Sequence, residues 1–202
     1  EWNIDGLQSA VHVQGTLNDP TDIDQGWTIE LAFPWSAFRG GYFEDNVPRD
    51  DFWRVNFSRV NWQFELNENR YSRKKDEEGK FLHENNWVWS PQGVINMHEP
   101  EHWGYVFFSS DLPGSSVTFE KPIDDEIKRY LYSLYRLQKT YYAENQSWAT
   151  SLNELNASPF ELKGNTIEPE FEIHGMGYII IAKSPFTNNT LIIVQDGKTF
   201  VK

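Results

Sequence analysis

The stretch GWTIELAFPW, residues 26–35, decides how the first half of this chain is interpreted. Every second position in it carries a large apolar residue, and these residues are Trp27, Ile29, Leu31 and Phe33. A period of two places them on one face of an extended strand, with polar residues on the other. Pro34 ends the strand because proline has no N–H to donate. The stretch therefore predicts a half-buried β-strand, followed by one helical turn at residues 35–38.

Similar alternation recurs on both sides of this stretch. It is found in AVHVQGTL (10–17), WRVNFSRVNW (53–62), NWVWSP (86–91) and WGYVFFS (103–109). In the second of these segments the apolar phase shifts by one residue after Arg59, which predicts a β-bulge. Residues 65–86 are charged and have no period, so we expect a solvated loop there. Short strands with long connections and no crossover helix predict a mainly β fold, an antiparallel, jelly-roll-like β-sandwich.

After residue 120 the pattern changes to that of a helix packed on a sheet. Apolar residues from Ile123 to Tyr141 recur with helical spacing, and Asp124 is the expected N-cap. Residues 147–155 are expected to form a short second helix. Strand-like segments joined by turns then follow at residues 177–183, 190–195 and 199–201.

The chain of 202 residues is long enough for one domain and a smaller second one. We expect the β-sandwich at residues 1–120 and a small helix-plus-antiparallel-sheet module, an α+β unit, at residues 121–202. The sequence begins at Glu1, without Met or a signal peptide and directly in strand-like sequence. This predicts that the sandwich is incomplete at its N-terminus and that an upstream segment or catalytic domain is missing.

Charge and composition exclude several classes of partner. The formal net charge is −12, so phosphate-rich nucleic acids and anionic membrane surfaces would be repelled. No apolar stretch approaches the length of a transmembrane helix, which argues against membrane insertion. Cysteine is absent, so disulfides and thiolate catalysis are excluded.

The letters HEPEH at residues 98–102 match the zinc-protease pattern H-E-x-x-H. That chemistry needs continuous helix through both histidines, so that one face holds the metal. Pro100 disfavours helix at the preceding residue and can only begin a helix itself. His98 would then lie outside the helix and His102 inside it. We therefore expect surface or site-edge histidines and no zinc proteolysis.

No other catalytic pattern stands out, so we expect a protein that is not an enzyme and needs no cofactor. The sequence has neither a nucleophile elbow nor a glycine-rich phosphate loop. A calcium site remains an open alternative, with Asp19, Asp22 and Asp24 as its ligands, because these residues occupy alternating loop positions. A plain polar turn is favoured, because neither the glycine nor the closing glutamate of an EF-hand follows in register.

Three blocks of the chain together resemble the second half of the family 9 carbohydrate-binding modules. They are GWTIELAFPWSAF, WRVNFSRVNW and NWVWSPQGVINMHEPEHWGYVFF, and the resemblance covers residues about 1–110. The most similar group is the family-9-like domains of envelope proteins in polysaccharide-degrading bacteria. The resemblance implies a β-sandwich that binds the ends of plant-type oligosaccharides or polysaccharides, located in the periplasm, on the outer membrane surface or secreted.

The same resemblance suggests which residues would touch sugar. In the family two tryptophans clamp a sugar ring. One of them falls upstream of Glu1, and the other falls near Met97, where this chain has no ring. Asn56 stands where a family member uses a side-chain amide on the ligand. The full candidate set for carbohydrate binding is Asn56, Arg59, Trp62, Trp87, Asn96, Met97 and His98.

Some of these candidates have structural interpretations as well. Arg59, Asn96 and His98 were added because they flank the same expected edge of the sandwich, and Trp62 and Trp87 because their rings could line the binding face. Arg59 beside Trp62 could equally form a structural cation–π pair. We expect Trp89 in the core.

The expected function is non-catalytic carbohydrate binding in a glycan-degrading bacterium. One alternative is a structural or interaction module that has kept the sandwich and lost the sugar clamp, which the missing ring at Met97 favours. A second alternative is an accessory domain of a glycoside hydrolase. An aromatic-lined groove on the sheet would favour the binding function. The absence of such a groove would favour the interaction module.

Overall fold

A computed structural model describes residues 4–38 and 47–202 of the chain. Residues 1–3 and 39–46, which belong to the first predicted domain, lie outside the described residues. The chain divides into two compact units, Glu1–Ser115 and Ser116–Lys202, here called the first and the second unit. Strands predominate over a single α-helix among the described residues, and every strand pair there is antiparallel, so the predicted mainly β class is confirmed.

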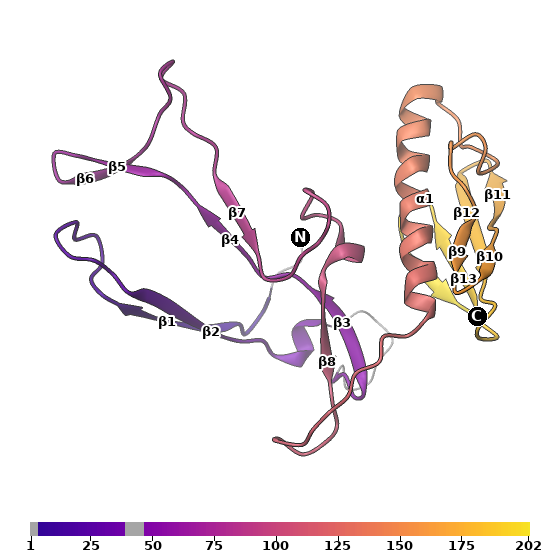
Figure 1. Ribbon diagram of the computed structural model, residues 1–202, viewed down its shortest axis with the longest axis horizontal. Coiled ribbons are helices and arrows are strands. Elements are labelled where there is room, and N and C mark those ends of the chain that lie inside the picture. Colours follow the sequence, from indigo (N-terminus) through magenta and orange to yellow (C-terminus); the bar gives the residue numbers. More distant parts are fainter. Residues whose placement is uncertain (1–3, 39–46) are drawn as a thin grey trace. The chain divides into compact units, whose positions relative to one another are not determined.

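The described residues of the first unit form four separate pairs of strands (Figure 1). The pairs are β1 (Gln8–Gln14) with β2 (Gly26–Ala32), β3 (Asp51–Val55) with β8 (Gly104–Phe108), β4 (Ser58–Asn61) with β7 (Asn85–Val88), and β5 (Phe64–Asn67) with β6 (Arg70–Arg73). Two short 3-10 helices, η1 (Trp35–Phe38) and η2 (Pro100–His102), connect them. These sheets are small and do not close on one another.

Two predictions for this unit were wrong in detail. The segment WRVNFSRVNW is not one bulged strand, because β3 pairs with β8 whereas β4 pairs with β7. The partner strand changes at residues 56–57, whereas the phase shift after Arg59 falls within β4, which pairs with β7 in one continuous register. The expected loop at residues 65–86 begins with the β5–β6 hairpin instead. Glu68 and Asn69 both have positive φ, 49° and 61°, which is the backbone of a two-residue type I′ turn.

The first unit has no apolar core within its described residues. Its only buried side chains there are polar, Gln92 and Glu101. The apolar residues of β2, by contrast, are exposed, with Trp27 at 52% and Ile29 at 48% of their full exposure. The alternation predicted for this strand is present, but nothing among the described residues covers its apolar face.

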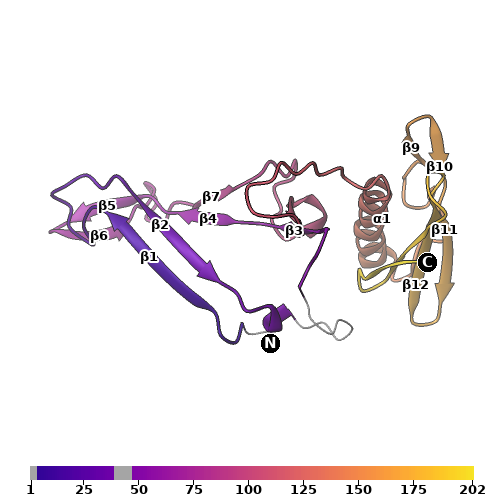
Figure 2. The ribbon, with the colours of Figure 1, turned by 90° about the horizontal axis from the view of Figure 1, so that it is seen from below.

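The second unit is a helix packed against a sheet. Helix α1 (Asp124–Asn145) lies along a four-stranded sheet (Figure 2). The sheet order is β11 (Glu170–His174), β12 (Gly177–Lys183), β13 (Thr190–Val194) and β14 (Thr199–Val201), and a small hairpin is formed by β9 (Phe160–Leu162) and β10 (Asn165–Ile167). Ile127, Leu131 and Leu134 of the helix are fully buried against the sheet residues Ile180 and Ile193.

For the second unit, the predictions of Asp124 as N-cap and of a short helix at residues 147–155 were wrong. The N-cap is Ile123, and Asp124 is the first helical residue. Residues 147–155 form turns and no helix. The side chain of Gln138 holds them, donating to the Ala149 carbonyl (2.8 Å) and accepting from the Ala149 N–H (3.0 Å). Strands β9, β10 and β11 were missed altogether.

No helix among the described residues combines the length and the apolar character needed to cross a membrane. Helix α1 has 22 residues, but it carries charged side chains along its length.

Candidate functional site

A broad groove with a volume of about 1020 Å³ opens on the first unit. It is formed by strands β2, β3, β4, β7 and β8 together with η1. Its walls are almost entirely apolar, and the large side chains are Trp27, Ile29, Leu31, Phe33, Trp35, Phe38, Trp53, Val55, Phe57, Trp87, Val88, Trp89, Val106 and Phe108. Only three lining residues carry polar side chains: Asn56, Ser58 and Arg59.

Four aromatic rings from three separate segments form one end of the groove. Trp35 of η1 meets Trp53 of β3 edge-on at 5.8 Å and Phe108 of β8 at 5.7 Å between ring centroids. Phe38 also meets Trp53, at 5.1 Å. Edge-to-face geometry is the favoured arrangement of aromatic pairs. These contacts therefore fix the rings against one another although they remain partly exposed.

Arg59 and Trp87 form the most ligand-like pair in the groove. They are cross-strand partners on β4 and β7, and the guanidinium carbon lies 5.9 Å from the indole centroid. Trp87 is 59% exposed, and Arg59 is exposed as well. The antiparallel register brings them together, so an open aromatic face and a set of N–H donors stand side by side.

Asn56 lies at the point where the chain leaves β3 and enters β4. It is half-buried and lines the groove, and its side-chain oxygen is buried without a hydrogen-bond partner. Buried amide oxygens in folded proteins nearly always accept a hydrogen bond. Asn56 is therefore an acceptor that lacks a donor in a groove that has few other polar groups.

Trp89 does not lie in a closed core. Its indole N–H donates to the Val55 carbonyl (3.0 Å), and its ring meets Phe57 edge-on at 5.5 Å. Even so, 46% of the side chain is exposed, and it lines the groove. The hydrogen bond links the residue after β7 to the end of β3 and so joins the two strand pairs at this point.

Trp62 is placed away from these residues. It does not pair with Arg59, since the guanidinium over its ring belongs to Arg73, at 3.5 Å from the centroid. Arg73 also lies 4.7 Å from the centre of the Phe81 ring. Trp62 is not among the groove-lining residues. The alternative of a structural Arg59–Trp62 pair is wrong, because Arg59 lies over Trp87 and Trp62 under Arg73.

Asn96, Met97 and His98 form a local turn that likewise does not line the groove. The Asn96 side chain accepts a hydrogen bond from the His98 backbone N–H (3.0 Å) and donates to Glu99 (3.1 Å). The Met97 carbonyl accepts from the Trp103 indole (2.8 Å). The structure thus brings Asn56, Arg59 and Trp87 together and keeps this turn apart from them.

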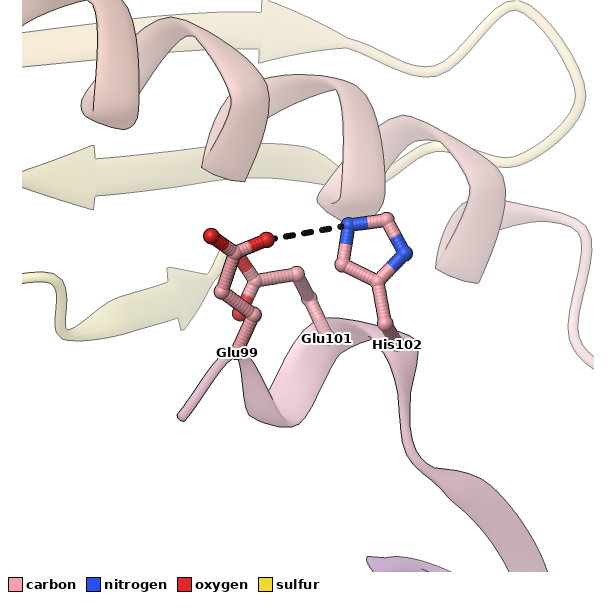
Figure 3. A group of neighbouring side chains, drawn as sticks. All are labelled: Glu99, Glu101 and His102. Atoms are coloured by element: carbon pink, nitrogen blue, oxygen red, sulfur yellow. Dashed lines mark ion pairs between the residues drawn. The ribbon is translucent and has the colours of Figure 1, made fainter. Parts of the chain in front are cut away.

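As predicted, the segment that matches the zinc-protease motif does not form a continuous helix through both histidines. Pro100 is the first residue of η2, which ends at His102, and His98 precedes it. A different set of side chains gathers here: Glu99, Glu101 and His102, with possible ligand atoms within 4.8 Å of one another (Figure 3). The His102 imidazole lies 3.6 Å from the Glu99 carboxylate, the distance of an ion pair between a protonated histidine and a glutamate.

The aspartates of the loop considered as calcium ligands, Asp19, Asp22 and Asp24, accept hydrogen bonds from donors of the protein itself. Asp19 accepts from the N–H and the hydroxyl of Thr21, and these hydrogen bonds lower the pKa of Asp19. Thr16 donates its hydroxyl to Asp22 (2.8 Å) and its N–H to Asp24 (2.9 Å). These bonds are those of a polar turn, and the three carboxylates do not converge as a ligand cluster within the described residues.

The main feature that sequence reasoning missed is a set of aromatic groove residues outside the candidate set for carbohydrate binding. Trp27, Trp35 and Trp53 all face the groove. Their alternation was visible, but alternation identifies one face of a strand and does not say what that face contacts.

Comparison of the chain with protein-family models, with curated proteins and with solved structures finds no match. The function is therefore argued from the residues of the groove.

Proposed function

We propose that the first unit binds carbohydrate without catalysis, at the Arg59–Trp87 pair. The observation that carries the proposal is the juxtaposition of an exposed indole and an exposed guanidinium on neighbouring strands, inside an aromatic groove. The family resemblance supports the same function, with an oligosaccharide or a polysaccharide end as the ligand. It also supports an envelope or secreted location in a glycan-degrading bacterium.

The chemistry of the pair suits a sugar. The C–H face of a pyranose ring packs against the face of an indole, and its hydroxyls accept hydrogen bonds from guanidinium N–H groups. Asn56 adds an amide whose oxygen has no donor in this structure. A sugar hydroxyl would supply that donor once the side chain turns toward the groove.

Titration calorimetry against a panel of plant-type oligosaccharides tests the proposal. We expect weak binding, with a Kd on the order of micromolar to millimolar, because few polar groups contribute. Trp87→Ala and Arg59→Ala should each weaken it by at least about tenfold, the effect of losing roughly 1.4 kcal/mol. Phe81→Ala is the matched control, since Phe81 is an exposed ring outside the groove.

Two outcomes would overturn the proposal. One is that no oligosaccharide in the panel binds the intact protein. The other is that a sugar binds but its affinity is the same in the Trp87→Ala, Arg59→Ala and Phe81→Ala proteins. Far-UV circular dichroism of each variant checks that its fold is retained.

We further infer that the strand pairs of the first unit belong to one layer of a β-sandwich. The antiparallel pairing and the single apolar face shared by β2, β3 and β8 support this inference.

An interaction module is the second candidate function, and a specific observation favours it. The groove is far more apolar than a sugar requires, which is the property of a surface that packs against protein.

A further inference from the structure

A second set of aromatic and basic side chains lies at the β5–β6 hairpin, outside the groove. The guanidinium carbon of Arg73, at the end of β6, lies 3.5 Å from the ring centroid of Trp62 and 4.7 Å from that of Phe81. The Lys75 ammonium lies 5.0 Å from the centroid of the same Phe81 ring. None of these four residues lines the groove. They form a separate group, here called the Arg73 cluster.

The strand register explains why both cations lie on one face. Arg73 pairs with Phe64 across the hairpin, and Lys75 pairs with Phe81 in an antiparallel bridge. Side chains that are directly opposed in an antiparallel pair lie on the same face, and so do those two positions apart on one strand. Arg73 and Lys75 therefore place two positive charges on the face that also carries the exposed rings of Phe64 and Phe81.

The residues that the structure describes provide no counter-charge for these two cations. The Nε atom of Arg73 is buried without a hydrogen-bond partner, and neither Arg73 nor Lys75 forms an ion pair with a described residue. Two carboxylates that follow in the chain have other partners. Asp76 accepts from the backbone N–H groups of Glu78 (3.0 Å) and Lys80 (2.9 Å), and Glu78 pairs with the Lys80 ammonium (3.6 Å). A guanidinium can only donate, so the cluster lacks an anionic acceptor.

The geometry of Arg73 favours a carboxylate on a sugar as that acceptor. Stacking on Trp62 leaves the edge of the guanidinium open, and a planar carboxylate fits this edge with two parallel N–H···O bonds. The net charge of −12 repels a multiply charged phosphate or polysulfate more strongly than a single carboxylate. The exposed ring of Phe81 offers a surface for the C–H face of a pyranose.

We propose that the Arg73 cluster is a second carbohydrate subsite, which binds the carboxylate of a uronic acid residue. Arg73 donates to the two carboxylate oxygens, Lys75 adds a second positive charge, and the Phe81 ring packs against the sugar. That the ligand is a carbohydrate rests on the proposed function of the first unit. That it is anionic rests on Arg73 and Lys75 alone.

Titration calorimetry of the intact protein with trigalacturonate and with its methyl ester tests the proposal. The ester keeps the sugar rings and removes the charges, so we expect it to bind at least about tenfold more weakly than the acid. Arg73→Gln should weaken trigalacturonate binding by at least about tenfold, and Arg73→Lys, which keeps the charge but loses the planar fork, by several-fold. Lys75→Gln should weaken it several-fold as well. Arg70→Gln is the matched control, because Arg70 is an exposed residue on the opposite face of β6.

Three outcomes would overturn the proposal. The acid and the ester could bind equally well, or Arg70→Gln could weaken binding as much as Arg73→Gln, which would be an effect of overall charge. The third is that a sulfated trisaccharide binds more tightly than trigalacturonate. Circular dichroism checks the fold of each variant, and Lys75→Gln, at an exposed position, keeps the test decisive if Arg73→Gln fails to fold.

Neutral oligosaccharides distinguish this proposal from the one made for the groove. Their binding should be weakened by Trp87→Ala and unchanged by Arg73→Gln. Binding of neutral sugars without binding of trigalacturonate would overturn the Arg73 subsite alone. Binding of trigalacturonate that depends on Arg73, without binding of neutral sugars, would overturn the groove site alone.

Discussion

The ring of Trp89 occupies the space in which a side chain at position 104 would begin. A Cβ atom added to Gly104 would lie 2.6 Å from Cζ2 of Trp89 and 2.7 Å from the hydroxyl of Ser90. Real Cβ atoms essentially never approach other atoms this closely. Gly104 begins β8, and Trp89 follows β7. The missing side chain on one strand thus allows the ring of the next segment to lie flat at the edge of the groove.

We therefore expect Gly104→Ala to push the Trp89 ring from its position. The clash resembles overpacking, which costs about 1–3 kcal/mol. Urea unfolding and a shift in the indole fluorescence measure the effect. Gly175→Ala is the control, because a Cβ there has nothing within 4 Å. In a double-mutant cycle, Trp89→Ala should remove most of the cost of Gly104→Ala, and strictly additive effects would contradict the contact.

Asp124 joins the start of α1 to the loop between β12 and β13. Its carboxylate accepts hydrogen bonds from the Ser184 hydroxyl (2.5 Å), the Thr187 hydroxyl (2.8 Å) and the Asn189 amide (2.8 Å). Burial by itself would raise the pKa of Asp124, but these hydrogen bonds outweigh burial and hold the pKa below its ordinary value. The charged form is therefore the one that the folded second unit stabilises.

Because the pKa of Asp124 is lower in the folded protein, its stabilisation is present above the unfolded pKa of about 3.9 and is lost as the pH falls through the folded value. Asp124→Asn should cost about 1–3 kcal/mol at pH 7 and flatten the loss of stability below about pH 4. Urea unfolding followed at 222 nm, where α1 gives the signal, measures both. Asp196→Asn, an exposed turn carboxylate, should change little; equal costs for the two variants would refute the role of Asp124.

The half-buried Tyr130 and the buried Tyr178 of the second unit differ in whether the hydroxyl has a partner. Tyr130 donates to the Ser158 carbonyl (2.9 Å), and burial raises the pKa of Tyr130 to about 12. The Tyr178 hydroxyl is buried without a partner, and burial raises its pKa further. Tyr130→Phe should cost about 1 kcal/mol, whereas Tyr178→Phe should be neutral or stabilising. Equal destabilisation by both variants, measured by urea unfolding, would contradict this difference.

The turn at residues 96–102 predicts a clear result from metal analysis. Because His98 lies outside η2, it cannot hold an ion together with His102 as a zinc protease would. We expect no stoichiometric zinc in the purified protein by elemental mass spectrometry, and no change on His98→Ala. Stoichiometric zinc that disappears in both His98→Ala and His102→Ala would restore the protease interpretation.

The helices and strands that could be predicted were those whose sequences have a strong local periodicity. The alternation around Ile29 predicted β2, and the helical stripe through Ile127 and Leu134 predicted α1. The stripe also included Leu137, which is 38% exposed. In its place Gln138 is fully buried because its amide bonds both backbone groups of Ala149. Such a polar core residue cannot be found from apolar spacing.

For the candidate site, the sequence named residues that the structure places in one groove, but it did not predict how they pair. Asn56, Arg59 and Trp87 were named, and the structure brings them to one groove. The pairing of Arg59 with Trp87 depends on the register of β4 with β7, two strands that are separated by the β5–β6 hairpin. Sequence neighbours alone suggested Trp62, which lies under Arg73 instead.

The sequence by itself determined that strands form at β1, β2 and β8 and a helix at α1, and that Pro100 prevents a continuous helix through HEPEH. These outcomes depend on steric and hydrogen-bonding rules that act within a few residues. Only the tertiary structure decided that β3 and β4 take different partners and that the alternating face of β2 lines an open groove. That information arises from contacts between residues far apart in the chain, whose register no local pattern specifies.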